Sequence, residues 1–339
     1  MASSVPFKLE DAVRDLETGF MLYRIRVPAP GTATDSHAGL QIRYLAASGH
    51  PSTADQFPDF RGQLLAFDAV PAGEWNLGRL SVAPAGTDAA GKFLLTSTDT
   101  AQLEDALGLV SGGPAWCGRT VDLVDLLDAF DARRAREPSP PNPPTADMQY
   151  MGHLAALVLP DPDRHDPAAA DADVVGAWAW PPGHAHGVAA ESRVYAVLAA
   201  QPADRPPLAP RFLAHVTDNG GARVIGSLVE RVDGGRAREA GPADLAGCRA
   251  ALGRLHALGF AYGRGLARHS FLVRADGGVL MQGFGGAWET QDEEVLAREM
   301  EGLDEVLARP SQMVQVGSVP GGRGGHDCSY QRCRHITGN

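Results

Sequence analysis

The chain has 339 residues, a hydrophobic fraction of 44% and a formal net charge of −11. This length allows two compact domains, or one large domain with an appendage. The acidic charge disfavours nucleic acid and anionic membrane surfaces as partners, because both carry negative phosphate groups. No apolar run reaches the ~18 residues that a membrane helix requires. Charged residues also stand where a signal peptide has its apolar stretch, so we expect a cytoplasmic protein.

Residues 1–137 have the pattern of a β-rich module. Short runs of β-branched and aromatic residues, separated by Pro, Gly and Ser, predict strands over residues 20–27, 39–47, 63–67, 79–82 and 92–96. A helix is predicted over residues 121–136, because Leu123, Leu127 and Phe130 share one face. The run PSPPNPP then interrupts regular structure, so residues 138–147 are predicted to be a linker.

Beyond the linker, strands and helices are predicted over residues 148–309. The expected elements are strands over residues 153–159, 173–180 and 223–232, helices over 187–200 and 243–258, and a hairpin of strands 271–274 and 278–281. Gly259 ends the second of these helices. A last helix is predicted to open at Thr290, with Glu293 three residues later completing a capping box. The Gly-rich residues 310–339 are predicted to be a flexible tail.

The order of these elements resembles that of a known family. Residues 211–232 (RFLAHVTDNGGARVIGSLVERV) and 252–259 (LGRLHALG), followed by a hairpin that ends in GFGG, are similar to fungal kinase-like proteins. These belong to the protein kinase and aminoglycoside phosphotransferase superfamily. GEWNLGRL at residues 73–80 resembles a motif of their N-terminal extension. The resemblance implies an α+β, protein-kinase-like bilobal fold, with a small β-rich lobe, an abbreviated helical lobe and a β-rich N-terminal extension.

Phosphoryl transfer in such a fold needs a Lys paired with a helix Glu, a catalytic Asp, and an Asn and an Asp on the metal. The resemblance aligns Gly176 with the Lys. The helix acid is present as Glu191, on a mainly apolar face with Val188, Tyr195 and Leu198. We expect this carboxyl to be partly buried, and then it must find another partner or take up a proton. A solvated position at the edge of the apolar stripe is the alternative.

The catalytic loop contains no carboxylate in either of two alignments. Counting backward from Phe-Leu-Val places Gly265 at the Asp and Ser270 at the Asn, whereas counting forward from LHALG places Arg264 at the Asp. Ser270 would bind magnesium weakly, and no base is present to orient an attacking hydroxyl. His269 is expected to lie at the surface or to pack near the hairpin, and to have no catalytic role. In the Asp-Phe-Gly triplet that binds metal, Gly283 replaces the Asp.

These replacements predict a catalytically degenerate pseudokinase that acts as a binding or regulatory protein, with an unidentified protein or small-molecule partner. No cofactor is expected, because a cleft without carboxylates does not hold magnesium with a triphosphate. Arg264 leaves weak, metal-free nucleotide binding open. The alternative is an enzyme, a divergent small-molecule phosphotransferase that uses ATP and non-standard residues.

The tail contains a second candidate site. Cys328, Cys333 and His335, together with His326, are four groups of the kinds that bind zinc. Their spacing permits a zinc site, and a tail with two free thiols is the alternative. The chain has only four cysteines, which do not make a disulfide framework.

Overall fold

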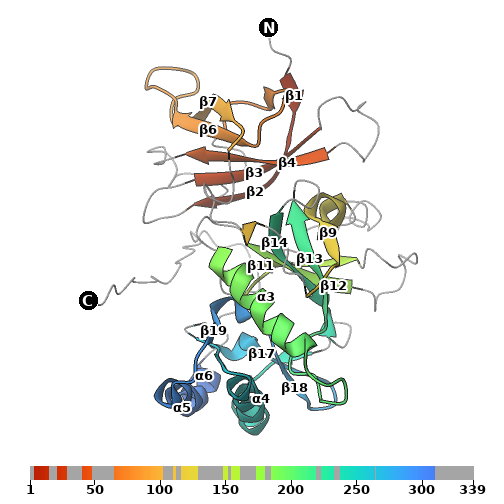
Figure 1. Ribbon diagram of the computed structural model, residues 1–339. Coiled ribbons are helices and arrows are strands. Elements are labelled where there is room, and N and C mark those ends of the chain that lie inside the picture. The colour runs from red at the N-terminus through yellow and green to blue at the C-terminus, as the bar shows by residue number, and fades with distance from the viewer. Residues whose placement is uncertain are drawn as a thin grey trace.

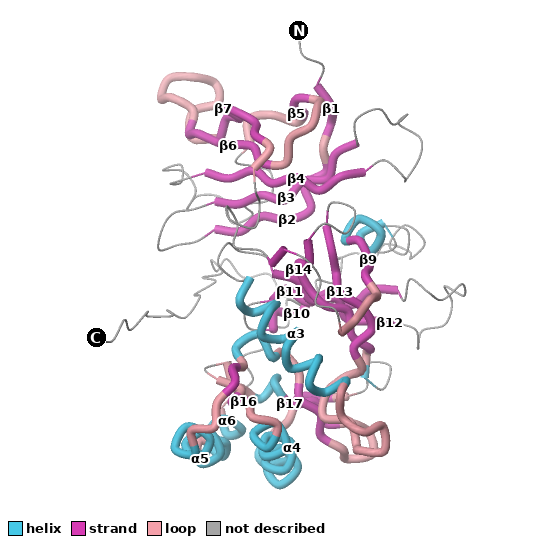
Figure 2. The backbone as a smooth tube through the Cα atoms, viewed as in Figure 1, coloured by secondary structure: helices cyan, strands magenta, loops and turns pink. Residues whose placement is uncertain are grey.

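The computed structural model of the chain is a mixed α+β fold with several small sheets and few helices among the described residues (Figure 1). The described residues are 4–14, 21–28, 40–47, 65–101, 110–111, 116–128, 148–151, 154–160, 173–179, 185–218, 223–232, 237–263 and 265–309. Two sheets lie one above the other, and α4 to α6 lie at the opposite end of the molecule from the upper sheet (Figure 2). No helix in these ranges is long and apolar enough to cross a membrane.

The upper, N-terminal module is built on a five-stranded sheet with the order β2-β3-β4-β6-β7. Its strands, with the small pair of β1 and β5, are β1 Ser4–Pro6, β2 Lys8–Arg14, β3 Met21–Pro28, β4 Leu40–Ala47, β5 Ala69–Pro71, β6 Leu77–Val82 and β7 Phe93–Asp99. The strands predicted over residues 20–27, 39–47, 79–82 and 92–96 are confirmed as β3, β4, β6 and β7. In the described part of the candidate at 63–67, Leu65 makes only an isolated bridge to Phe93.

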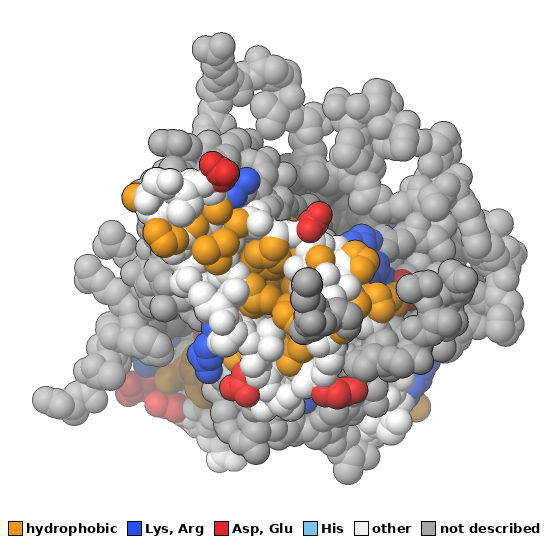
Figure 3. Space-filling model, turned by 90° about the horizontal axis from the view of Figure 1, so that it is seen from above, with side chains coloured by type: hydrophobic (Ala, Val, Ile, Leu, Met, Phe, Trp, Pro, Cys, Tyr) orange, Lys and Arg blue, Asp and Glu red, His pale blue; other side chains and the backbone are white. Residues whose placement is uncertain are grey.

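Trp75 and Leu80 of the GEWNLGRL motif at residues 73–80 belong to the core of this module. The guanidinium of Arg43 lies 4.4 Å from the centroid of the Trp75 ring, and both side chains are buried. Gly78 is required because a Cβ atom there would lie 2.6 Å from the Leu45 side chain. Figure 3, which views this end of the molecule from above, shows apolar side chains near the centre of the face and charged ones towards its sides.

The second sheet has the strand order β10-β11-β12-β14-β13-β9, and β8 pairs with β14. Its strands are β8 Val110–Ser111, β9 Thr120–Asp122, β10 Met148–Met151, β11 Leu154–Pro160, β12 Asp173–Ala179, β13 Phe212–Asp218 and β14 Arg223–Glu230. The strands predicted over residues 153–159, 173–180 and 223–232 are confirmed as β11, β12 and β14. β8 and β9 precede residues 138–147, which lie outside the described residues, so this sheet takes strands from both sides of the predicted linker.

The helix predicted over residues 121–136 is corrected at its start. Residues 121 and 122 belong to β9, which pairs with β13 in parallel, and the helical residues are 123–128. Residues 129–136 lie outside the described ranges. Leu123 and Leu127 are buried, as the spacing predicts, and they pack in a cluster that joins the two sheets.

This cluster makes the two sheets share a core. Leu22, Ile42 and Tyr44 of the upper sheet pack with Ala214 and Leu228 of the lower one. Since apolar area removed from water is worth about 25 cal/mol per Å², this contact contributes to the stability of both sheets.

A buried ion pair lies beside the shared core. The Tyr44 hydroxyl donates to Asp218 at 3.0 Å, and the Arg223 Nε donates to the same carboxylate at 2.9 Å. These three polar side chains are almost completely buried. The pair therefore fixes the upper strand β4 against β13 and β14 of the lower sheet.

The remaining elements are α3 Ala185–Ala199, β15 Arg238–Glu239, η6 Pro242–Asp244, α4 Leu245–Ala257, β16 Phe260–Ala261, η7 Arg268–Ser270, β17 Phe271–Val273, β18 Val279–Met281, η8 Phe284–Gly286, β19 Trp288–Glu289, α5 Glu293–Glu301 and α6 Leu303–Ala308. The predicted helices over residues 187–200 and 243–258 and the predicted hairpin are confirmed as α3, α4 and β17–β18. Gly259 has a φ of 86°, the left-handed conformation with which glycine ends a helix.

The predicted capping box at Thr290 is wrong. The N-cap of α5 is Asp292, whose carboxylate accepts hydrogen bonds from the backbone of Glu294 and Val295. Thr290 accepts instead from the backbone N–H of Asp292, at 3.1 Å. The expected single helix is also interrupted at Gly302, which separates α5 from α6.

Candidate functional site

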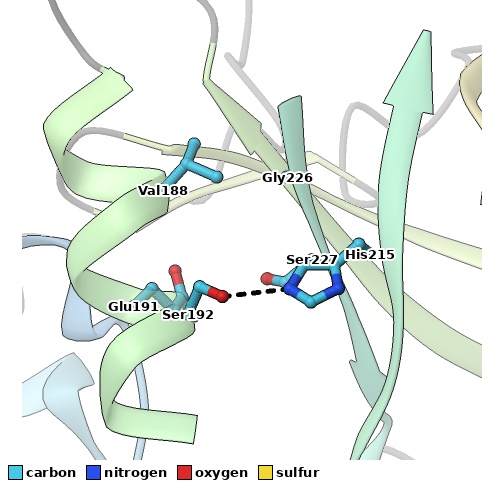
Figure 4. A pocket seen from close by; sticks show the side chains of 6 residues that line it. All are labelled: Val188, Glu191, Ser192, His215, Gly226 and Ser227. Atoms are coloured by element: carbon cyan, nitrogen blue, oxygen red, sulfur yellow. Dashed lines mark hydrogen bonds between the residues drawn. The ribbon is translucent and has the colours of Figure 1, made fainter. Parts of the chain in front are cut away.

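The candidate site lies where α3 packs between the lower sheet and the turn η8 (Figure 4). Gly187, in the first turn of α3, lies at this contact: a Cβ atom on it would lie 3.4 Å from the carbonyl oxygen of Gly285, at van der Waals distance. Two turns later, the ring of Tyr195 meets that of Phe284 edge to face, with centroids 5.7 Å apart. The helix that carries Glu191 is thus held closely against the GFGG segment.

Glu191 is buried, as the spacing of α3 predicts. Only 4% of the residue is exposed, and its Oε2 has no hydrogen-bond partner within the described part of the chain. Burial raises the pKa of Glu191 to about 7, since a charged carboxylate loses its water without gaining a counter-ion. The alternative of a solvated acid at the edge of the stripe is therefore wrong.

A polar cluster that the sequence analysis did not predict lies beside Glu191. Ser192 Oγ and His215 Nε2 are hydrogen-bonded at 3.0 Å (Figure 4), and the Trp116 indole N–H donates to the same Ser192 oxygen at 3.3 Å. Burial lowers the pKa of His215, an effect that the backbone of Cys117 partly opposes. The imidazole is therefore neutral at physiological pH and supplies no positive charge to Glu191.

The space between α3 and the sheet is narrow. It is lined by Val188, Glu191 and Ser192 of the helix and by His215, Gly226 and Ser227 of the strands. It has no room for a water-sized sphere, and a buried water needs both space and two to four polar partners. Glu191 therefore lies in a dry environment.

Gly176, the predicted replacement of the Lys, pairs across the sheet with Leu228. The β12 residue that pairs with Ser227, which lines the space beside Glu191, is Ala177. Neither residue has an ammonium group.

Gly283, the predicted replacement of the metal-binding Asp, has a left-handed backbone with a φ of 73°. The Tyr262 hydroxyl lies between two backbone carbonyls here, 2.7 Å from Gln282 O and 2.8 Å from Gly283 O. A Cβ atom at position 283 would come within 3.2 Å of that hydroxyl. The turn is thus built around a glycine and a buried tyrosine.

The catalytic-loop candidates are placed in part. Gly265 is exposed, and Ser270 is completely buried, with its Oγ accepting from the backbone N–H of Ala267 at 3.1 Å. Ser270 therefore closes the loop on itself. Arg264 lies outside the described residues, so its contact with an anion stays a prediction. His269 lies next to the hairpin, where its backbone carbonyl accepts from the Gln282 side chain at 2.8 Å.

Glu299 of α5 anchors this loop and was not predicted. Its carboxylate accepts from the backbone N–H groups of Tyr262 and Gly263, at 3.0 and 2.6 Å, and from His256 at 2.7 Å. Glu299 is one of four Glu in the nine residues of α5, so the sequence does not single it out. The helix pattern gives no indication of a partner 37 residues earlier.

A chain of aromatic contacts connects these parts. Tyr262 contacts Phe284, Phe284 contacts Tyr195, and Tyr195 contacts Phe212 of β13, with ring centroids 6.0, 5.7 and 5.1 Å apart. The described structure thus brings Glu191, the Tyr262 loop and the Gly283 turn into one continuous packed region.

A second hollow, of about 350 Å³, lies between the N-terminal module and residues 123–128. Its charged lining includes Arg26 and Asp128, which form an ion pair with each other, and Arg26 also pairs with Glu10 at 2.6 Å. Arg26 and Asp128 in this hollow are therefore paired, whereas Oε2 of Glu191 has no hydrogen-bond partner among the described residues.

No protein-family model matches the chain, and no curated protein matches it. Within the described residues, no three His, Cys, Asp or Glu side chains are grouped so that they could hold a metal ion. Cys328, Cys333 and His335 lie outside those residues, so zinc binding by the tail stays a prediction.

Proposed function

We propose that the chain is a kinase-like protein without phosphotransfer activity, which acts as a cytoplasmic binding or regulatory protein. The observation that carries the proposal is Glu191, a helix acid that is buried and, among the described residues, has no cation beside it. In active protein kinases this acid pairs with a Lys on the third strand, and the pair must form for catalysis. The opposing strand here has Gly176 and Ala177 in place of that Lys.

The order of the elements supports a kinase-like fold. The meander β10–β11–β12 makes β12 a third strand, and the acid-bearing α3 follows it directly, which is the arrangement of the Lys and Glu in protein kinases. α4, the Tyr262 loop, the β17–β18 hairpin and the Gly283 turn then follow in the order of a kinase's catalytic parts.

A further feature argues against binding of a metal–triphosphate complex. Gly283 has no carboxylate to hold magnesium, and its backbone is occupied by the Tyr262 hydroxyl. The metal would therefore lack its usual ligand at this position.

A thermal-shift titration tests the proposal, because a ligand that binds only the folded state raises Tm. The full chain is heated with ATP and MgCl₂, with ATP alone and with MgCl₂ alone. We expect no magnesium-dependent shift. A rise of several degrees that needs both ATP and Mg²⁺ would contradict the proposal and favour the alternative, a divergent small-molecule phosphotransferase.

The same titration addresses Arg264. A small shift with ATP alone that is lost in Arg264→Ala would identify metal-free anion binding, which the proposal accommodates. Transfer of phosphate from ATP to a small alcohol or amine acceptor, measured directly, would instead establish the enzyme alternative.

A further inference from the structure

We propose that Glu191 is a proton-controlled latch: the neutral acid keeps α3 packed against the lower sheet and the GFGG turn, and loss of its proton loosens the helix. This inference goes beyond the proposed binding function, because it assigns a regulation to the site. It concerns the packing of α3, and it does not require a bound nucleotide.

The geometry of the site allows a proton to neutralise the Glu191 carboxylate. The Glu191 side chain ends in a space too narrow for a water molecule. Its Oε2 has no hydrogen-bond partner in the described part of the chain. A buried carboxylate without a counter-ion is strongly unfavourable, whereas the neutral acid has a much smaller desolvation cost. A hydrated cation would first have to displace the helix.

Among the described residues, the titratable groups around Glu191 include no permanent cation. On α3 itself the neighbour is Tyr195, and the loop before β17 contributes Tyr262, whose pKa is raised by burial, so both phenols are neutral. The sheet contributes His215, whose pKa burial lowers, and Glu230, which interacts with Tyr195. α5 contributes Glu299, which interacts with Tyr262. The segment Phe284–Gly286 carries no titratable side chain.

The sign of the effect follows from proton linkage. The pKa of Glu191 is about 7 when α3 is packed and near its ordinary 4.5 when the helix is open and the acid is solvated. The packed state therefore binds the proton more tightly. The proton's stabilisation of the packed state is complete below about pH 4.5. It is lost as the pH rises to about 7, and above that pH the balance between the packed and open states changes no further. The difference predicts an increase in the open population on the order of a hundredfold across this window.

The latch acts on the GFGG turn as well. Gly187 and Gly285 are in close contact, and Glu191 follows Gly187 by one helical turn. Loosening of α3 therefore removes the packing that covers Phe284 and exposes apolar surface of the site. A partner that recognises this surface would bind more tightly at neutral than at mildly acidic pH.

Native-state hydrogen exchange of the full chain, followed by mass spectrometry from pH 4.5 to 8, tests the latch. After correction for the intrinsic exchange rate, we expect the protection of the peptide that covers α3 to fall on the order of a hundredfold between pH 4.5 and 7. Protection of β3 and β4 is expected to change much less. Glu191→Gln, which has the same shape and cannot ionise, should remove the pH dependence.

Glu230→Gln is the matched control, because Glu230 is 39% exposed and pairs with Arg211 at the surface. It should keep the wild-type profile. A flat profile for α3 in the wild type would overturn the latch, and so would a wild-type profile that persists in Glu191→Gln. If Glu191→Gln does not fold, the pH profiles of α3 protection in the wild type and in Glu230→Gln still test the latch.

The latch and the pseudokinase proposal can be refuted independently of each other, because the nucleotide titration does not depend on hydrogen exchange in α3.

Discussion

At the scale of single residues, Gly283 is a glycine that its turn requires. It has a φ of 73°, which costs a non-glycine residue about 1–2 kcal/mol. Its carbonyl also accepts a hydrogen bond from Tyr262 at 2.8 Å. The turn at Gly283 is thus held by the Tyr262 hydroxyl.

We predict that Gly283→Ala lowers the free energy of unfolding by about 1–2 kcal/mol, because alanine resists the left-handed conformation and its Cβ would crowd the Tyr262 hydroxyl. Urea denaturation measures the change. Gly265→Ala is the control, because its added Cβ would be 4.0 Å from the nearest atom. Equal destabilisation by the two substitutions would contradict the role assigned to Gly283.

The burial of Glu191 could be predicted from its own helix, whereas its surroundings could not. A periodic apolar face with one acid reports burial directly, since residues three and four apart lie on one side of a helix. The Ser192–His215 hydrogen bond joins residues 23 positions apart, on a helix and a strand. Local spacing contains no information about such a contact.

At the scale of elements, strands and helices with a strong pattern were predictable. β3, β4, α3 and α4 each have a sustained periodicity, and their ends fall within two residues of the prediction. The two-residue strands β16 and β19 have no periodicity of their own, because they exist only through their pairing with each other. The N-cap of α5 was mispredicted because Thr290 and Asp292 are both good capping residues, and Asp292 carries the stronger acceptor.

The anchoring of the Tyr262 loop by α5 gives a prediction at this scale. Glu299→Gln should lower the free energy of unfolding by about 2–3 kcal/mol, because hydrogen bonds from Tyr262, Gly263 and His256 lose a charged acceptor. Chemical denaturation measures the loss, and exchange of the loop amides should rise at the same time. Glu301→Gln, on the exposed side of the same helix, is expected to change stability by less than about 0.5 kcal/mol.

At the scale of the whole molecule, the boundary between modules was the hardest feature to predict. A Pro-rich run at residues 138–147 suggests a linker between separate units. The lower sheet nevertheless contains β8 and β9 from before that run, and one apolar cluster spans both sheets. Strand pairing across 95 residues, as between Thr120 and His215, leaves no local signal in the sequence.

The shared core predicts that the two sheets unfold together. Asp218 and Arg223 are 0% and 5% exposed, and Asp218 also accepts from Tyr44 of the upper module. Asp218→Asn leaves the Arg223 guanidinium buried without its counter-ion, which costs about 3–5 kcal/mol. Calorimetry should show one transition in the wild type and a single transition at lower temperature in the variant. Asp304→Asn, which breaks an exposed pair with Arg249, should cost less than about 1 kcal/mol. Two separate wild-type transitions, with only one shifted by Asp218→Asn, would show that the modules are independent and that their contact does not stabilise the fold.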